Sequence, residues 1–580
     1  MSTRSSFSAV AAVRRSAFLA AAAAVCACTS TAAGTLAHAP GDAGAAAGDL
    51  ATDGAVAARF EGGGLAPDNG PARRGDALDA GGGAVDAPSA DLPDATPRGA
   101  DGAGGLDAVG EAVTADAVLD GAADAPTAAD VPTGELAATD ASQAPGPTWD
   151  LPMIADPATA NCAFFDKHTV FDGGQLLDVW RLTYQAWQYK DGALQPIPIA
   201  AFAARPAGNS KLPGVVLAHG LGGMAQEKHA TELAARLGYF VIAYTGPGGG
   251  DKADNKSGGD PAGWNNGYKM FDTLADVRGS WFWGHAVAAM RAVTCLGVRP
   301  DVDADKLGIT GFSAGGVVSL LAAGHDPRVK AAVPLSGTLA WAKATEAPKA
   351  WQHSLLQKAG LSIASPEWKK LQAELIDPAV ALSTAGAKVL LVNGTTDEFF
   401  PLTAHLQTLQ ALPGSQHRTS LAANFDHGCY GVSGGEGKAT IENRAKLRAE
   451  GGQKLWFAHW FGTDPAFGYV PQPPQPQVQL VGAATLLSAV VDPGGGKYDI
   501  DQVEFWASVD DAFLFVGTTL DCKGNVCSKL AAVVAPPNAL YYADVQYKTK
   551  GLIPQKFSVS SPPVLPAGLV PKVRGIDTCL

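Results

Sequence analysis

A serine, an acid and a histidine follow one another along this chain in positions typical of nucleophilic catalysis. Ser313 lies in Gly311-Phe312-Ser313-Ala314-Gly315, between an apolar segment and a run of small residues. This pattern is typical of a sharp turn from a strand to a helix, where small neighbours leave the serine hydroxyl open to a substrate. Because such a pattern arises readily in a glycine-rich chain, the flanking residues must support it.

Two later residues are placed to activate Ser313. Asp397 follows the apolar segment 387–392, and His427 lies in the loop segment 424–428. A serine hydroxyl is a poor nucleophile unless a base takes its proton, and imidazole can accept and return a proton near neutral pH. A carboxylate on the other ring nitrogen holds the productive tautomer. We therefore predict Ser313 as nucleophile, His427 as base and Asp397 as the acid that orients it.

Two further acids compete with Asp397 for this role. Asp426 is the immediate neighbour of His427, so its side chain should diverge from the imidazole. Glu398 comes one residue after the end of the predicted strand. Asp397 remains the predicted partner.

A glycine-rich loop upstream is the predicted oxyanion hole. The apolar strand predicted at 212–218 ends in His219-Gly220-Leu221-Gly222-Gly223. Glycines let backbone N–H groups turn toward a developing negative charge. We predict the amides of Leu221 and Ala314 as the donors, with His219 shaping the turn. The alternative is an ordinary turn between a strand and a helix.

The surrounding chain alternates between apolar strand-like segments and helical segments, which predicts a parallel sheet and an α/β fold. The predicted strands cover residues 212–218, 239–244, 307–312, 329–335, 387–392 and 418–421. The predicted helices cover residues 230–237, 271–296, 315–323 and 403–412. Between 335 and 387 three tryptophans punctuate helical segments, which form either a cap over a pocket or helices packed on the sheet.

Other motifs do not indicate a metal or a cofactor. The loop Gly246–Gly250 lacks the Gly-Lys-Ser/Thr of a phosphate-binding loop, so we interpret it as a rim of the substrate site. Asp301, Asp303 and Asp305 lack the glycine and the glutamate of a calcium loop. The remaining histidines, His285 among them, are expected to be surface or packing residues, and Cys429 is expected to be structural or disulfide-bonded.

The segment from about Leu177 to Phe461 resembles the α/β-hydrolase superfamily. The stretches 213–220 and 302–316 are similar to those of the dienelactone hydrolase and acetyl xylan esterase group. This resemblance implies a mostly parallel central sheet flanked by helices, and acyl transfer to water through an acyl-serine. Dienelactone hydrolases carry a cysteine where this chain has Ser313, which favours an esterase. Prolyl oligopeptidases share similar motifs but usually carry a β-propeller, which the N-terminal segment here cannot build.

The N-terminal quarter has the composition of an exported chain with a disordered tether. Residues 1–30 combine arginines, a short apolar run and small residues, which predicts a signal peptide. Cys28 is a candidate for lipid attachment, and ordinary cleavage nearby is the alternative. Residues 31–147 are rich in Ala, Gly, Asp and Pro and hold 19 acidic and four basic residues, so the tether accounts for the whole-chain net charge of −13. We expect this region to be disordered.

Beyond a predicted catalytic domain at 148–468, the chain carries a second module. A proline-rich linker is predicted at 469–478, and a small β-sandwich at 479–580, with strands at 502–508, 513–516, 540–547 and 557–561. Cys522 and Cys527 bracket a turn and are placed to close a hairpin disulfide.

The leading hypothesis is an exported serine hydrolase that cleaves small-molecule or polymer-linked carboxylic esters without a cofactor. No basic stripe indicates nucleic acid. One alternative is a serine peptidase of the prolyl oligopeptidase type. Another is a non-catalytic surface protein whose C-terminal module contacts a carbohydrate, a cell surface or another partner through four aromatic residues: Trp506, Tyr541, Tyr542 and Tyr547.

Overall fold

The computed structural model describes residues 148–263, 266–428, 436–508, 510–531 and 539–573. The expected signal peptide, Cys28 and the acidic tether lie outside these residues, as do Cys429 and Cys579. Among the described residues, no helix has the length and apolarity needed to cross a membrane.

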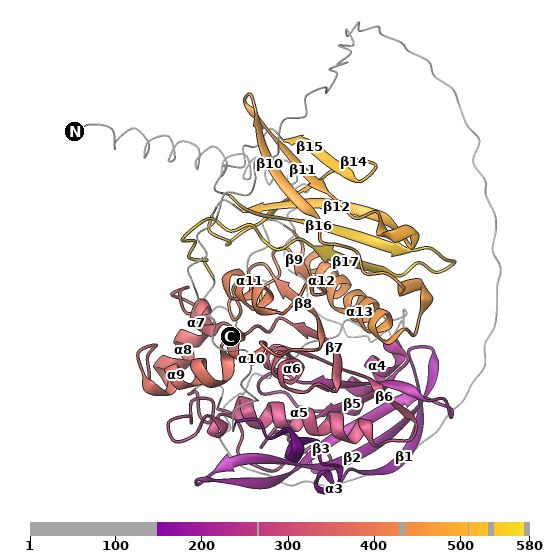
Figure 1. The fold of residues 1–580 in the computed structure, drawn as a ribbon, viewed down its shortest axis with the longest axis vertical. Helices are drawn as coiled ribbons and strands as arrows, with labels where there is room; N and C mark the ends of the chain where they lie inside the picture. Colours follow the sequence, from indigo (N-terminus) through magenta and orange to yellow (C-terminus); the bar gives the residue numbers. More distant parts are fainter. Residues whose placement is uncertain (1–147, 264–265, 429–435, 509, 532–538, 574–580) are drawn as a thin grey trace, which may run out of the picture. The chain divides into compact units, whose positions relative to one another are not determined.

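A long mixed sheet organises the described part of the chain (Figure 1). Its strands within the predicted catalytic domain, residues 148–468 and called the catalytic region below, are β1 (Ala163–Asp172), β2 (Gln175–Lys190), β3 (Ala193–Pro206), β4 (Leu212–Ala218), β5 (Phe240–Tyr244), β6 (Val302–Phe312), β7 (Val329–Leu335), β8 (Lys388–Gly394) and β9 (Arg418–Ala422). Neighbours in the order β5-β4-β6-β7-β8-β9 run parallel, and β1, β2 and β3 add antiparallel strands beside β5. The carboxyl ends of β6, β8 and β9 therefore meet at one edge, as the predicted α/β fold requires.

Helices cover both faces of the parallel strands. They are α2 (Leu151–Ala155), α3 (Pro157–Ala160), α4 (Glu227–Leu237), α5 (Trp281–Gly297), α6 (Ala314–His325), α7 (Trp341–Ala344), α8 (Trp351–Lys358), α9 (Pro366–Leu371), α10 (Pro378–Ala381), α11 (Leu402–Ala411), α12 (Lys438–Lys446) and α13 (Gly452–Phe461). Residues of α5 and α6 share one hydrophobic cluster, and residues of α4 and α13 share the other. The α/β-hydrolase fold predicted from the sequence is confirmed.

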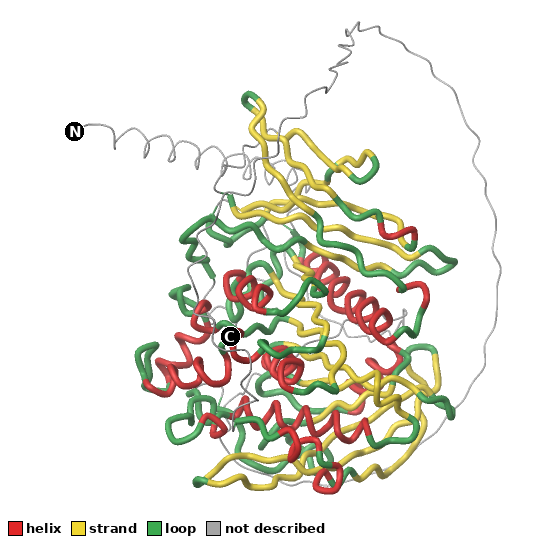
Figure 2. Tube along the Cα trace, in the orientation of Figure 1, coloured by secondary structure: helices red, strands yellow, loops and turns green. Residues whose placement is uncertain are grey.

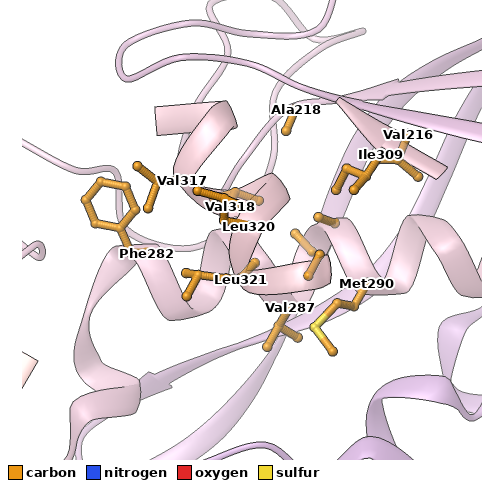
Figure 3. Close-up of a cluster of buried hydrophobic side chains, with 14 of the residues drawn as sticks. Val216, Ala218, Phe282, Val287, Met290, Ile309, Val317, Val318, Leu320 and Leu321 are labelled. Atoms are coloured by element: carbon orange, nitrogen blue, oxygen red, sulfur yellow. The ribbon is translucent and has the colours of Figure 1, made fainter. Parts of the chain in front are cut away.

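Strand alternation divides the core between these two faces. In β8, Val389 and Leu391 belong to the α5–α6 cluster, whereas Leu390 and Val392 belong to the α4–α13 cluster. Successive side chains of a strand point to opposite faces, so a strand covered on both sides is a continuous apolar run. Figure 3 shows the α5–α6 side, where Val317 and Leu321 lie close to Phe282 and Val287.

The predicted helix 271–296 is ten residues too long at its start. Residues before Trp281 form a loop and a short 3-10 turn, η1 (Val277–Gly279). Ser280 is the N-cap of α5, and its hydroxyl accepts a hydrogen bond from the N–H of Phe282. Serine and aspartate compete with helical hydrogen bonding inside a helix but favour its first position, so the helix begins here.

The segment between β7 and β8 packs its aromatic residues inward. Trp341, Trp351 and Trp368 are all buried in the same cluster as α5 and α6. The ring centroid of Trp341 lies 5.8 Å from that of Trp351 and 6.4 Å from that of Trp368. This arrangement agrees with the alternative in which these helices pack on the sheet.

The C-terminal module contains two sheets built mostly from antiparallel strands, which dominate this part of Figure 2. Its strands are β10 (Gln475–Val481), β11 (Ala484–Val490), β12 (Tyr498–Ser508), β13 (Val516–Thr519), β14 (Asp521–Lys523), β15 (Val526–Ala531), β16 (Leu540–Thr549) and β17 (Lys556–Ser560). One sheet has the order β10-β11-β15-β14. The other, β17-β16-β12-β13, continues the catalytic sheet, because β17 pairs with β9 through Ser560 and Thr419.

The module therefore differs from the separate unit expected beyond a linker at 469–478. The strand β10 already begins at Gln475. Leu455 and Ala458 of α13 share a hydrophobic cluster with Val503 of β12 and Val545 of β16. A joined sheet and a common core bind the module to the catalytic region.

Disulfides and aromatic residues of the chain take structural positions. The predicted hairpin disulfide between Cys522 and Cys527 is confirmed, and a second joins Cys162 to Cys295. Trp506, Tyr542 and Tyr547 are buried, and Tyr541 stacks on Phe505. These rings therefore do not form the exposed face that the carbohydrate-binding alternative invoked.

Candidate active site

Ser313 occupies the turn between β6 and α6 in a strained backbone conformation. Its φ is 60° and its ψ is −121°, a region that residues other than glycine rarely adopt. Backbone bonds hold the turn: the N–H of Ser313 donates to Leu335 O at 2.9 Å, and its carbonyl accepts from the N–H groups of Gly316 and Val317 at 2.8 Å and 3.1 Å. Such a turn matches the strand-to-helix elbow predicted from the sequence.

The flanking glycines permit a close approach of backbone segments. A Cβ atom placed on Gly311 or Gly315 would collide with the carbonyl oxygen of Ala218 at the end of β4. Helix α6 can therefore begin directly against β4 only because both positions lack a side chain. A side chain at either position would thus collide with a neighbouring strand.

His427 contacts both other members of the predicted triad. Its Nε2 lies 2.8 Å from Ser313 Oγ, and its Nδ1 lies 3.0 Å and 3.1 Å from the two carboxylate oxygens of Asp397. The rings of Phe312 and Phe399 stack on the imidazole, with centroids 5.0 Å and 4.0 Å away. The structure thus brings together the three residues predicted from sequence order.

Asp397 is held in place by the backbone that follows it. Its carboxylate is fully buried, and its Oδ1 accepts hydrogen bonds from the N–H groups of Phe399 and Phe400, each at 2.9 Å. Bonds from two backbone donors fix the direction of this carboxylate. This carboxylate therefore faces the imidazole as an oriented acceptor.

The two competing acids bind the backbone around His427. Glu398 Oε2 accepts the N–H of His427 at 3.0 Å, and Asp426 Oδ1 accepts the N–H of Gly428 at 3.0 Å. Burial, followed by the charge of Asp397, raises the pKa of Glu398 to about 8. Burial and the charge of Asp397 thus favour the uncharged form of Glu398, which limits the negative charge buried beside Asp397.

The pKa of His427 results from opposing influences. Burial lowers the pKa of His427, whereas the Asp397 carboxylate and its hydrogen bond raise it. The resulting pKa lies above its ordinary value. A base with a raised pKa binds the proton of Ser313 more readily. The arrangement can accept that proton while Ser313 attacks an electrophile.

The predicted oxyanion loop lies directly beside the nucleophile. A Cβ atom placed on Gly220 would lie 3.3 Å from Ser313 Cβ and 3.8 Å from Ser313 Oγ. Leu221 is the next residue, and Ala314 is the first residue of α6. Ala314 therefore directly follows the serine in sequence, and Leu221 directly follows the glycine that lies beside it.

His219 supports this loop from inside the protein. Its Nε2 accepts the N–H of Gly246 at 2.7 Å, and its Nδ1 lies 2.6 Å from Gly220 O. Because a backbone N–H can only donate, Nε2 carries no proton and Nδ1 donates to Gly220. Burial lowers the pKa of His219 to about 4, so the ring is neutral at physiological pH. The expected role of His219 in shaping the turn agrees with these bonds.

Two residues that contact His219 from beneath the oxyanion loop had only general roles in the sequence prediction. His285, expected among the packing histidines, stacks on Trp281, and its Nε2 lies 3.3 Å from His219 O. Gly246, interpreted as part of a substrate rim, packs against the His285 ring so closely that a Cβ would collide with it. The start of that glycine-rich loop is therefore part of the support for His219. Among the described residues, no cluster of histidine, cysteine or acidic side chains is arranged to hold a metal ion.

A mostly parallel sheet with a serine after β6, an acid after β8 and a histidine after β9 defines an α/β hydrolase. Residues 199–421 match the model of the dienelactone hydrolase family, which confirms the resemblance seen in the sequence. No curated protein matches the chain.

Two acetyl xylan esterases are among the solved structures that match part of the chain. The acetyl xylan esterase from Paenibacillus sp. R4 is 19% identical, with a TM-score of 0.39 over 50% of this chain and 89% of that one. Acetyl xylan esterase 1 from Thermoanaerobacterium sp. JW/SL YS485 is 16% identical, with a TM-score of 0.33 over 50% of this chain and 88% of that one.

Proposed function

We propose that this protein hydrolyses carboxylic esters through an acyl-serine intermediate on Ser313. The observation that carries the proposal is the continuous hydrogen-bond path from Asp397 through His427 to Ser313 Oγ. In the first step Oγ attacks the ester carbonyl as His427 Nε2 takes its proton, and the imidazolium returns that proton to the leaving alcohol. Water then attacks the acyl-serine as His427 Nε2 takes a proton from the water. The imidazolium returns that proton to Ser313 Oγ as the acid leaves.

The amides of Leu221 and Ala314 are the proposed donors to the developing oxyanion. Gly220 O faces His219 Nδ1 and the N–H of Gly223, at 2.6 Å and 3.0 Å. In a trans peptide the following N–H points the opposite way, so the Leu221 amide points away from His219. Ala314 opens α6, where N–H groups have no acceptor within the helix and the helix dipole is positive. Both features support stabilisation of negative charge beside Ser313.

Replacing Ser313 by alanine tests the proposal. We expect Ser313→Ala to lower kcat on p-nitrophenyl acetate by at least about 10³-fold, because the nucleophile is removed while the fold stays intact. A fluorophosphonate probe should label the wild-type protein at Ser313 and leave the variant unlabelled. Ester hydrolysis that survives in the variant would show that another group does the chemistry.

Substrate screening separates the ester class from its alternative. The purified protein should be compared on short p-nitrophenyl esters, acetylated xylan and proline-containing amides matched to the esters. We expect higher kcat/KM on esters, because an alcohol leaves more readily than an amine. Preference for the proline amides would favour the peptidase alternative instead.

We also propose that the protein is exported. The disulfides Cys162–Cys295 and Cys522–Cys527 support this, because such bonds persist mainly in oxidising compartments. The signal-like segment at 1–30 is consistent with export, and Cys28 is the proposed lipid attachment site. Mass spectrometry of the mature N-terminus would distinguish a lipidated Cys28 from ordinary cleavage, and an uncleaved N-terminus would contradict export through this segment.

A further inference from the structure

The loop that carries His427, residues 423–428, is bonded to the C-terminal module. This segment is called the histidine loop below. The side-chain Nδ2 of Asn424 donates to Phe515 O at 2.9 Å, and the N–H of Phe515 donates to Asn424 Oδ1 at 2.8 Å. Asn424 is only 2% exposed. One amide side chain thus satisfies both main-chain groups of a residue far along the sequence.

The backbone of Asn424 links the same residue to the other side of the site. Its φ is 58°, a left-handed conformation that asparagine tolerates better than most residues. Its N–H donates to Thr395 Oγ1 at 2.9 Å, just after β8 and just before Asp397. Asn424 therefore joins the acid-bearing strand end, the histidine loop and the C-terminal module.

A buried ion pair holds the base of the histidine loop to the same module. Arg448, in the π-helical turn η3 (Leu447–Gly451), donates through Nε to the carbonyl of Leu421 at the end of β9. Its Nη2 lies 2.6 Å from Asp544 on β16, and both side chains are fully buried. Asp544 also accepts the hydroxyls of Ser558 and Ser560 on β17.

A second arginine makes a parallel connection. Arg444 of α12 donates through Nη1 to Ala423 O at 2.8 Å. Its guanidinium lies 4.6 Å from the ring centroid of Trp506 on β12. The carbonyl of Leu421 in β9 and that of Ala423, the first residue of the histidine loop, are thus bound by side chains that contact the module.

We propose that the C-terminal module is a built-in support of the active site, and that Asn424 is the positioning residue through which it holds His427. This inference rests on the proposed function of the triad. His427 must stay within hydrogen-bond reach of both Ser313 and Asp397, and a displacement of about 1 Å can lower a catalytic rate by about 100-fold. The module acts on the rate through loop position and contributes no group to the reaction.

The variant Asn424→Gly tests this support. Glycine retains the left-handed backbone and removes the amide, which bonds Phe515 and also donates to Glu436 Oε2 at 2.9 Å. The matched control is Tyr547→Phe, which removes a buried hydroxyl bonded to Asp492 O at 2.8 Å within the module, away from the histidine loop. We expect Asn424→Gly to lower kcat by about 10- to 100-fold with KM within about twofold of wild type. Tyr547→Phe should retain wild-type kcat.

Two outcomes would overturn the support. Wild-type kcat in Asn424→Gly would show that the amide does not position His427, and an equal loss in Tyr547→Phe would show that any weakening of the module has the same effect. If Asn424→Gly does not fold, Asn424→Asp provides the second variant. Aspartate keeps an acceptor for Phe515 N–H but cannot donate to Phe515 O, and we expect a smaller kcat loss with unchanged KM.

Hydrogen exchange separates this inference from the proposed function. Amides of residues 421–428 should exchange faster in Asn424→Gly than in wild type. Their exchange rates should be unchanged in Tyr547→Phe. The rate of fluorophosphonate labelling should fall in Asn424→Gly alone. Both readouts are independent of the natural substrate, so a protein inactive on every ester would refute the proposed function while still testing the support. Unchanged exchange in Asn424→Gly would refute the support while leaving the esterase proposal intact.

Discussion

Two aromatic rings stack on His427, while its two nitrogens face Ser313 and Asp397. Stacking by Phe312 and Phe399 limits rotation of the ring, so the imidazole stays in the plane that joins its two partners. Burial in this setting lowers the pKa of the imidazole, whereas Asp397, followed by Glu398 and Asp426, raises it above its ordinary value. Asp397 therefore holds the tautomer of the base and is the main acid that raises its proton affinity.

The pH dependence of the reaction should reveal this influence. Because neutral His427 is the active base, kcat/KM should fall with decreasing pH, with a midpoint above the ordinary histidine value of about 6.5. In Asp397→Asn the raising charge is lost, so the midpoint should move to lower pH, and kcat should fall by about 10⁴-fold. The pH profile of fluorophosphonate labelling measures this midpoint in the wild type and in the variant. An unmoved midpoint in Asp397→Asn would show that another group sets the limb.

At the scale of elements, the site depends on how closely α6 approaches β4. Gly315 sits at the start of α6 against the carbonyl of Ala218, with no room for a side chain. The strained φ of Ser313 persists because this contact and the bonds to Leu335 and Gly316 over-determine the turn.

Alanine substitutions at two glycines measure the importance of this approach. Gly315→Ala should lower the free energy of unfolding by more than about 3 kcal/mol, because its Cβ would overlap backbone. The control Gly386→Ala lies in an exposed turn where a Cβ meets nothing within 4 Å, and should change stability by less than about 0.5 kcal/mol. Chemical denaturation followed by tryptophan fluorescence compares the two. Equal stability of both variants would mean that α6 can move away from β4 at little cost.

The elements around the triad were predictable from sequence because buried parallel strands appear there as short apolar segments. Each of these segments is followed, within a few residues, by a glycine, a serine or an acidic residue. The antiparallel β1, β2 and β3 were not predicted, although alternation of Leu182, Tyr184 and Ala186 with polar residues in β2 could have signalled an antiparallel strand. The contact between Asn424 and Phe515 has no local signal at all. Its two partners lie far apart in sequence, and only the folded chain joins them.

At the scale of the whole molecule, the catalytic region and the C-terminal module share one sheet and one core. The pairing of β17 with β9 continues the sheet across the boundary. Arg448 and Asp544 form a buried ion pair across this boundary, with one partner on each side. Removal of either partner would leave the other buried without compensation.

Asp544→Ala should therefore destabilise the molecule as a unit. We expect a loss of about 3–5 kcal/mol, because Arg448 is left buried and unpaired. Calorimetry should show that the catalytic region and the C-terminal module unfold in a single transition in the wild type. The variant should show the same single transition at a lower temperature. A module that melts separately from the catalytic region would contradict this coupling.

The position of β16 and β17 late in the chain also affects when catalysis can begin during biosynthesis. Ser313, Asp397 and His427 leave the ribosome well before the strands that hold the histidine loop. A growing chain would therefore carry every reacting group while lacking the scaffold that aligns them. Hydrolytic capacity would arise only after synthesis has passed β17, which would spare esters in the producing compartment from a half-made enzyme.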